Sequence, residues 1–129
     1  MVRAVWVDKG AAIGILDECL PGLGAGEPGA QFLLVYDDDT PAAAAALGYW
    51  PDGARLGPVA VRAAHRRRGL GGLALRMLIR RAFNMGHTKQ YVETPTEAEP
   101  FFNAVGFKAK ERTSGITIME REGDITGHC

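Results

Sequence analysis

The sequence predicts a protein of the α/β (α+β) class, in which strands and helices alternate along the chain. Hydrophobic segments follow one another in the order strand, helix, three strands, helix, strand, helix and two strands. One amphipathic segment, residues 70–85, is a much stronger helix candidate than the others. The length of 129 residues fits one domain. We therefore expect residues 1–129 to form a single domain.

The N-terminal segment predicts a strand followed by a short helix. Met1–Val7 alternates enough to form a strand, and Asp8 can cap the helix that follows it. The apolar stripe of this helix is expected at Ile13, Leu16 and Leu20. Pro21–Ala30 contains four glycines and two prolines, so it cannot be regular structure. We interpret it as a surface loop or as a lid over a substrate site.

Three strands are predicted next. Gln31–Tyr36 is an apolar run that indicates a buried strand. The five consecutive alanines within Ala42–Trp50 favour a helix. The strand at Gln31–Tyr36, however, needs a hairpin partner, and we therefore predict that Ala42–Trp50 is a strand. Leu56–Val61 is the third strand, and Pro58 within it implies a bulge or an unpaired backbone position.

The strongest helix, Leu70–Met85, has apolar side chains at three- and four-residue spacing and ends at Gly86. Its apolar face is expected at Leu73, Ala74, Met77, Leu78, Ala82 and Met85, and Leu75, Ile79 and Phe83 widen it. A strand is predicted at Gln90–Glu93 and a short helix at Glu97–Val105. A closing hairpin is predicted from the strands Phe107–Arg112 and Ile116–Glu120.

The formal charge of zero conceals a strongly basic segment. Residues 1–54 carry 2 basic and 8 acidic side chains, and residues 91–129 carry 4 basic and 7 acidic ones. Residues 55–90 between them carry 9 basic side chains and no acidic one. Such a block favours a local anionic partner over a uniformly basic protein.

Composition excludes several classes of protein. No apolar run approaches the ~20 residues of a membrane span, and the first residues lack the apolar core of a signal peptide. Cys19 and Cys129 cannot form a disulfide framework, so we expect reduced thiols and a cytoplasmic location. No Cys/His cluster has zinc-ligand spacing, so no metal is expected.

A basic, glycine-rich turn at His65–Leu73 (HRRRGLGGL) lies between a strand and the start of the strong helix. Its glycines allow a ligand to come close to the backbone, and the N–H groups at a helix N-terminus attract anions. The segment therefore suits the binding of a phosphate or pyrophosphate. A solvated turn that only caps the helix is one alternative. Gly69–Ala74 also fits a dinucleotide fingerprint with Glu93 downstream, but Val61 ends its strand too far before Gly69.

Arg66-x-x-Gly69-x-Gly71, after a strand and opening a long helix, resembles the acetyl-CoA motif of the GNAT N-acetyltransferase superfamily, Q/R-x-x-G-x-G/A. Phe101–Phe107 (FFNAVGF) resembles the helix-ending signature of the same superfamily, aromatic-Tyr-x-x-x-Gly-Phe. The interval between the two motifs also suits the superfamily. The resemblance covers residues 55–120 in good register, whereas residues 1–50 match in element order.

The resemblance implies a mixed central β-sheet, flanked by helices, that is splayed open between strands 56–61 and 90–94. The pantetheine arm of acetyl-CoA would pair with strand backbone in that gap, and the pyrophosphate would lie on the N–H groups of the turn. The residues implied to bind this co-substrate are Val59, Ala60, Val61, Arg66, Arg67, Arg68, Gly69, Leu70, Gly71, Gly72 and Phe102.

The expected reaction is attack of an amine on the thioester of acetyl-CoA. Many members of the superfamily place a Tyr as general acid where this chain has Phe102, which cannot donate a proton. Glu93 is our candidate general base, with a surface carboxylate or a partner for the arginines as the alternative. Tyr49 is our candidate proton donor, with core packing as the alternative, and a water chain could replace a dedicated base. His65 is expected to be a turn or ligand-facing residue.

Acidic residues around the expected acceptor site favour a cationic amine, as a small molecule or on a peptide. They are Asp17, Glu18, Glu27, Glu97 and Glu99. The alternatives are a CoA-binding protein without transfer activity, which the Phe at the acid position suggests, and a nucleic-acid-binding module that uses the basic block. Against nucleic acid, the helix after the arginines is apolar on most of its circumference. The resemblance also allows a homodimer.

Overall fold

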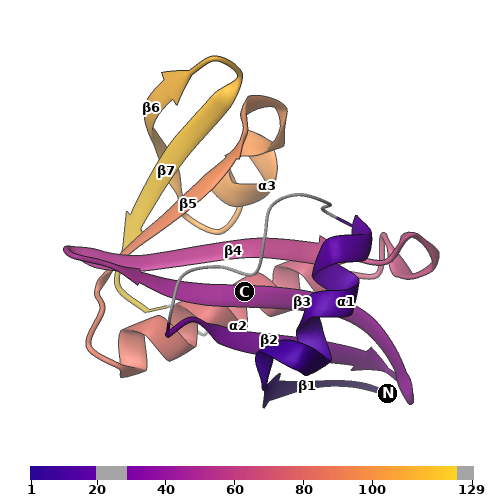
Figure 1. The fold of residues 1–129 in the computed structure, drawn as a ribbon. Helices are drawn as coiled ribbons and strands as arrows, with labels where there is room; N and C mark the ends of the chain where they lie inside the picture. Colours follow the sequence, from indigo (N-terminus) through magenta and orange to yellow (C-terminus); the bar gives the residue numbers. More distant parts are fainter. Residues whose placement is uncertain (20–28, 125–129) are drawn as a thin grey trace.

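The computed structural model describes residues 1–19 and 29–124, and within them a mixed sheet has the strand order β1-β2-β3-β4-β5-β7-β6 (Figure 1). Its strands are β1 (Val2–Val7), β2 (Gln31–Asp37), β3 (Thr40–Trp50), β4 (Gly53–Val61), β5 (Lys89–Pro95), β6 (Lys108–Thr113) and β7 (Ile116–Glu122). The helices are α1 (Lys9–Cys19), α2 (Leu70–Asn84) and α3 (Glu99–Asn103), with 3₁₀ turns at Ala63–His65 and Thr96–Ala98. The predicted class and element order are confirmed.

The alanine-rich segment is a strand, as predicted, because it pairs on both sides. Residues of β3 lie antiparallel to β2 on one side and to β4 on the other. Ala42–Ala46 is completely or almost completely buried. Small side chains on both faces allow a helix to pack closely above and below the strand, so tertiary contacts override the helical propensity of alanine.

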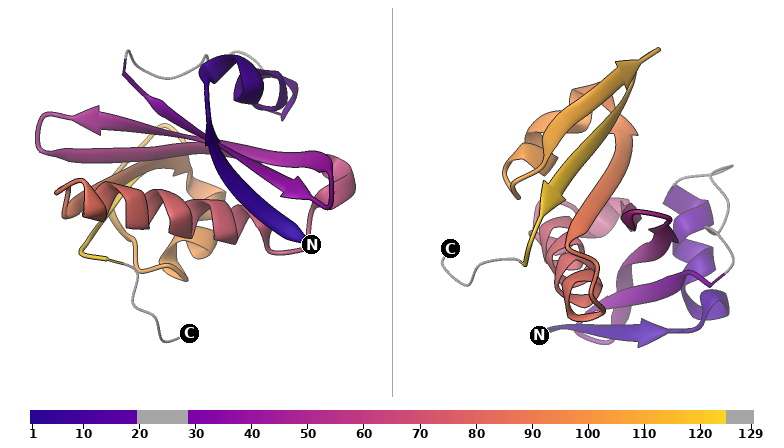
Figure 2. Two further views of the ribbon diagram at one scale, coloured as in Figure 1. Left: turned by 90° about the horizontal axis from the view of Figure 1, so that it is seen from below. Right: turned by 90° about the vertical axis from the view of Figure 1, so that its left-hand side faces the viewer.

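Two helices cover opposite faces of the sheet (Figure 2, left). On one face, α2 packs on the larger core with Leu33, Val35 and Leu47. On the other face, α1 packs on a smaller core that includes Phe32 and Leu34. Alternate residues of one strand therefore belong to different cores, which assigns each side chain of the central strands to the α1 face or the α2 face.

The buried stripe of α1 differs from the predicted one. Ala12, Ile15 and Leu16 are buried, whereas Ile13 is half-buried and Leu20 lies outside the described residues. Ala12 is small and belongs to the same core as Ala44 and Ala46 of β3, so the helix can approach this strand closely. Residues 21–28 of the predicted loop also lie outside the described residues.

The predicted apolar face of α2 was partly wrong. Its buried residues are Leu70, Ala74, Leu75, Leu78, Ile79 and Ala82. Leu73 and Met77 are partly buried at the margin of the core, while Met85 follows the helix end and is exposed. The short helix predicted at Glu97–Val105 is a 3₁₀ turn followed by α3, a single helical turn in which Pro100 stands near the N-terminus.

The sheet opens between β4 and β5. In the described chain these parallel strands pair at Ala54–Gln90 and Arg55–Tyr91 and then diverge. Beyond that junction β5 continues beside β7 along its whole length. Strands β5, β7 and β6 consequently rise away from β1–β4, as the right-hand view of Figure 2 shows. The splay implied by the resemblance is thus present.

Candidate active site

A cleft of about 710 Å³ fills the opening between β4 and β5. Residues from both diverging strands, the ends of two helices and α3 line it. These residues are Cys19, Arg55, Leu56, Gly57, Pro58, Val59, Ala60, Val61, Arg66, Gly71, Glu93, Thr94, Pro95, Ala98, Phe101, Phe102 and Ile116. The lining is mostly apolar, and its charged side chains are Arg55, Arg66 and Glu93.

The β4 wall of the cleft contains a bulge, as Pro58 predicts. The pairing of β3 and β4 shifts register, so that Gly57 and Pro58 together face the stretch between Ala45 and Leu47. Gly57 has a φ of 108°, in the left-handed region that favours glycine. After the bulge the β4 backbone pairs with β3 alone in the described chain, so its other edge faces the cleft.

The glycine-rich turn brings backbone N–H groups to one end of the cleft. Arg67 and Gly69 both have positive φ, at 66° and 77°. The first helical hydrogen bond of α2 runs from Leu73 N–H to Gly69 O. The amides of Leu70, Gly71 and Gly72 therefore precede the helical ladder, where they carry a partial positive charge. Gly71 itself lines the cleft.

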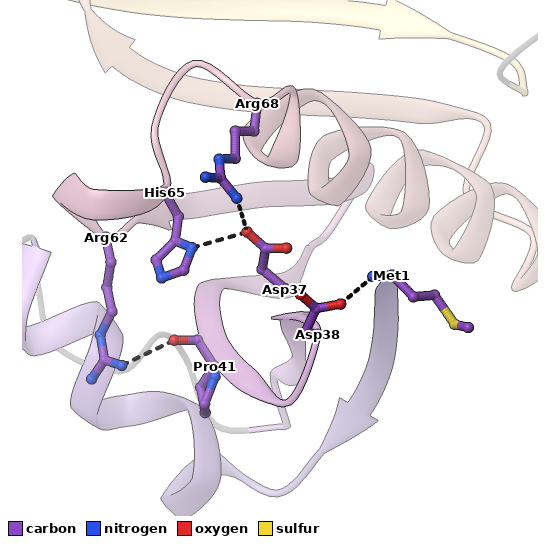
Figure 3. A network of polar contacts seen from close by, with 7 residues as sticks. All are labelled: Met1, Asp37, Asp38, Pro41, Arg62, His65 and Arg68. Carbon is purple, nitrogen blue, oxygen red and sulfur yellow. Dashed lines mark hydrogen bonds and ion pairs between the residues drawn. The ribbon is translucent and has the colours of Figure 1, made fainter.

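The side chains of the turn are anchored to neighbouring elements. Arg66 Nε–H donates to the Val61 carbonyl at 2.9 Å. Asp37, at the end of β2, accepts from Arg68 Nη1 at 2.6 Å and lies 3.1 Å from His65 Nδ1 (Figure 3). The hydrogen bonds from His65 and Arg68 hold the pKa of the Asp37 carboxyl below its usual range. His65 is thus a turn residue that positions the loop.

Several arginines of the basic block make contacts within the protein. Arg62 donates to the Pro41 carbonyl at 2.9 Å and to Glu18 at 3.2 Å. Arg81 donates to Gln31 and stacks over Trp6. Much of the +9 charge is therefore used to connect elements. Within the described chain, Arg55 and Arg66 are the members of the block that line the cleft.

Glu93, the candidate general base, lines the cleft. Its carboxylate is 3.5 Å from Arg55 Nη2, and its side chain is 46% exposed against 25% for that of Arg55. Two diverging strands supply the two side chains, at the point where the strands separate. Arg55 was not singled out from the sequence. Its position directly before the Leu56–Val61 run is the signal that could have marked it.

Tyr49 does not reach the cleft. Its hydroxyl lies 3.1 Å from Met85 Sδ, its ring contacts His87, and burial raises the pKa of its phenol. It packs with the core on the α2 face, near the C-terminal end of that helix. The expectation that Tyr49 donates a proton at the site is therefore not supported by its location.

Phe102 forms part of the cleft wall, as the resemblance implies. It makes edge-to-face contacts with Phe101 and Phe107, at centroid distances of 5.0 and 5.9 Å. The residue thus connects the cleft to the core. Proton donation to a leaving group is not available from its ring.

The acidic residues predicted around the acceptor have different surroundings in the structure. Glu99 is buried, and Arg112 and Thr117 donate three hydrogen bonds to it, which lower its pKa to about 2. Glu18 faces Arg62, and Glu27 lies outside the described residues. Glu99 and Glu18 are engaged by cations of the protein itself, whereas Asp17 and Glu97 are exposed.

Within the residues that the structure describes, no group of three metal-ligating side chains is present. No helix in that part of the chain combines the length and apolarity that a bilayer crossing requires.

Comparison with known proteins agrees with this architecture. The ribosomal-protein-S18-alanine N-acetyltransferase from Escherichia coli superposes with a TM-score of 0.79 at 19% identity, covering 99% of this chain and 97% of that one. A GNAT family acetyltransferase from Elizabethkingia anophelis with acetyl-CoA bound gives 0.81 at 14% identity, covering 94% and 97%. The PaiA N-acetyltransferase from Thermoplasma acidophilum in complex with coenzyme A gives 0.75 at 12%, covering 95% and 99%.

A search of curated protein sequences finds no match. The profile of the Acetyltransferase (GNAT) family, in contrast, matches residues 5–107, most of the chain. That span includes the open strand edge, the glycine-rich turn and the Phe101–Phe107 signature. The chain belongs to the acetyltransferase (GNAT) family.

Proposed function

We propose that this protein transfers an acetyl group from acetyl-CoA to an amine. One observation carries the proposal: a single cleft joins an open strand edge, a mostly apolar lining and the N–H groups that start α2. Family membership supports acyl transfer as the general reaction. The structures that hold acetyl-CoA or coenzyme A support a CoA thioester as the donor.

The residues of the cleft fit a CoA thioester. Backbone groups at an open strand edge need hydrogen-bond partners, and the amides of a pantetheine arm can supply them to Val59, Ala60 and Val61. The N–H groups of Arg67–Gly72 would hold the pyrophosphate. Arg66, anchored on Val61, would contribute a full positive charge beside them.

Proton transfer is the main chemical demand on the protein. Bound acetyl-CoA supplies the activated acyl group: the amine nitrogen forms the new amide bond, the carbon–sulfur bond breaks, and coenzyme A leaves as thiol. An amine with a pKa near ~10.4 is about one part in a thousand neutral at pH 7. Glu93 would accept the proton that the ammonium must lose before attack. The second nitrogen proton would go to the departing thiolate, without an acid at Phe102.

The test is acceptor-dependent thiol release from acetyl-CoA over a panel of amines. We expect turnover with the wild type and a loss of about 10²–10⁴ in kcat for Glu93→Gln, the range of a general base. Glu111→Gln, an exposed carboxylate on β6 outside the cleft lining, is the matched control and should retain activity. Tight binding of acetyl-CoA without turnover of any amine would favour a CoA-binding protein without transfer activity.

A further inference from the structure

We propose that a groove between β1 and α2 binds an extended, acidic segment of another protein, which adds to β1 as a further strand. The groove shares no lining residue with the cleft between β4 and β5, so peptide binding there is a property separate from acetyl transfer. Two features mark this surface: guanidinium groups that line the groove, and a free backbone edge on the strand beside it.

The groove has a volume of about 350 Å³ and is lined mainly by one side of α2, with a single aromatic ring from β1. Its lining residues are Trp6, Arg76, Met77, Arg80, Arg81 and Asn84. Three of these six side chains are guanidinium groups, which suit carboxylates and other planar or tetrahedral anions. The composition of the lining therefore favours an anionic ligand.

The contacts of the arginines leave the groove with an excess of positive charge. Arg81 Nε donates to a neutral side-chain amide on β2 at 3.0 Å, and its guanidinium carbon lies 4.3 Å from the centre of the Trp6 ring. Arg80 contacts Asp124 at 3.0 Å, with 53% of its side chain exposed. In the described part of the chain, no hydrogen bond or ion pair engages the exposed Arg76. Because α2 contains no acidic side chain, the positive charge is only partly balanced.

The strand beside the groove has an unpaired edge. β1 ends the sheet and, among the described residues, pairs with β2 alone (Figure 1). The Met1 carbonyl accepts from the Asp38 N–H at 2.7 Å, so the backbone groups of Met1 face β2. Since successive residues of a strand direct these groups to opposite edges, those of Val2, Ala4 and Trp6 point away from the sheet. Such an edge is a template for a further strand.

The groove and the free edge meet at Trp6, whose side chain lines the one and whose backbone belongs to the other. One face of a strand added to β1 would be turned towards α2, where its carboxylates could reach Arg76 and Arg80. Main-chain hydrogen bonds to β1 would fix the register of the added strand. A nucleic acid could satisfy the guanidinium groups but has no backbone that pairs with a strand edge. The combination therefore favours an acidic peptide segment.

A second copy of this chain fits the surface poorly. The two edge strands of the sheet, β1 and β6, each carry more basic than acidic side chains. Pairing of β1 with the β1 strand of a second copy would also bring two arginine-lined grooves together, and like charges at close range repel. An acidic segment of a different protein has the charge that the groove lacks.

The experiment measures, by fluorescence anisotropy, the binding of a labelled octapeptide of alternating aspartate and valine, whose aspartates share one face when extended. We expect saturable binding that weakens as salt is added. The octapeptide of asparagine and valine should bind at least about tenfold more weakly, the effect of lost charged hydrogen bonds. An excess of acetyl-CoA should leave the affinity unchanged, because it would occupy the cleft.

The charge contribution is tested by Arg76→Gln combined with Arg80→Gln, which should weaken binding of the acidic peptide by about tenfold or more. Lys108→Gln combined with Lys110→Gln is the matched control. It removes two positive charges from exposed positions on β6, outside the groove lining, and should bind the peptide like the wild type.

The strand edge is tested by Ala4→Pro. Proline removes an N–H that points away from β2, so the pairing within the sheet can persist, and peptide binding should fall about two- to tenfold. Ala4→Val keeps the N–H and is the control. Circular dichroism checks that the variant folds, and Val2→Pro, at an exposed position with the same backbone orientation, replaces it if it does not.

Four results would overturn the proposal. They are equal binding of the acidic and neutral peptides, unchanged affinity in the double arginine variant, unchanged affinity in the folded proline variant, and displacement of the peptide by acetyl-CoA. A single-stranded RNA octamer that bound more tightly than the acidic peptide would assign the groove to nucleic acid instead. None of these results bears on acetyl transfer, which the thiol-release assay tests separately.

Discussion

Glu99 is a buried carboxylate whose charge is held by its neighbours. Arg112 donates to both carboxylate oxygens at 2.8 Å, and Thr117 adds a third hydrogen bond at 2.6 Å. These contacts lower the pKa of Glu99 from an ordinary 4.5 to about 2. The side chain ties α3, part of the cleft wall, to the β6–β7 hairpin.

The lowered pKa of Glu99 predicts a pH-dependent contribution to stability. A carboxyl with a depressed folded-state pKa stabilises the fold fully above its unfolded pKa, and the contribution is lost as the pH falls from 4.5 towards 2. Glu99→Gln should therefore lower the free energy of unfolding at neutral pH, and the difference from wild type should shrink at about pH 3. Denaturant unfolding at both pH values measures this. A difference independent of pH would contradict it.

Asp37 is predicted to hold the glycine-rich turn in its ligand-binding shape. Asp37→Asn removes the negative charge that His65 and Arg68 contact, so acetyl-CoA affinity should fall by about tenfold, the low end for one charged hydrogen bond. Asp39→Asn, an exposed change in the same β2–β3 turn, is the control. Calorimetric titration gives both constants. Equal affinities in the two variants would mean that the turn does not depend on Asp37.

Single residues were predictable from the sequence where a motif fixes their backbone. Arg66 and Gly71 lie in the cleft because the turn and the start of α2 are local features. Phe102 does so because a short helix follows β5. Tyr49 and Arg55 could not be assigned, since their sheet face depends on strand register, and the register shifts at the Gly57–Pro58 bulge.

At the scale of elements, the junction of β4 and β5 determines where the cleft begins. Gly53, the first residue of β4, lies against β5, and a Cβ built on it would be 2.5 Å from the Lys89 carbonyl oxygen. The close approach allows the parallel pairing at Ala54 and Arg55 before the strands diverge. A residue without a side chain is needed here for space rather than for backbone conformation.

Gly53→Ala is expected to destabilise the protein by about 1–3 kcal/mol, the usual cost of overpacking against groups that cannot move. Gly14→Ala is the matched control, because a Cβ there meets nothing within 4 Å in an α-helix. It should stabilise the protein by roughly 0.5–1 kcal/mol through helix propensity. Denaturant unfolding of both variants tests the pair. If Gly53→Ala left the free energy of unfolding unchanged, the two strands at the junction would be able to move apart freely.

Most elements follow from the sequence because their hydrophobic periodicity is local. The β3 segment shows the limit, since its alanines become a strand only through pairing with β2 and β4. Local patterns also misplace helix faces: Ala12, a small residue, is fully buried in the core beneath α1. Such errors arise where packing between distant segments, rather than side-chain size, selects the buried face.

At the scale of the whole molecule, the sheet divides into two parts that meet along a short junction. β1–β4 carry α1 and α2, and β5–β7 stand apart with α3 beside them (Figure 1). The opening between them could be expected only through the family resemblance, because pairing between β4 and β5 is non-local. The zero net charge hides many opposite charges that form ion pairs between elements. The contact between Arg62 and Glu18 is one of these pairs.

The central claim is that this opening binds acetyl-CoA, and calorimetric titration of the protein with acetyl-CoA tests it most directly. We predict saturable one-to-one binding in the wild type. Binding should be clearly weaker in Gly71→Leu, because a side chain at that position grows towards Val61 and Phe101 across the cleft. The absence of binding to the wild type at millimolar acetyl-CoA would contradict the account.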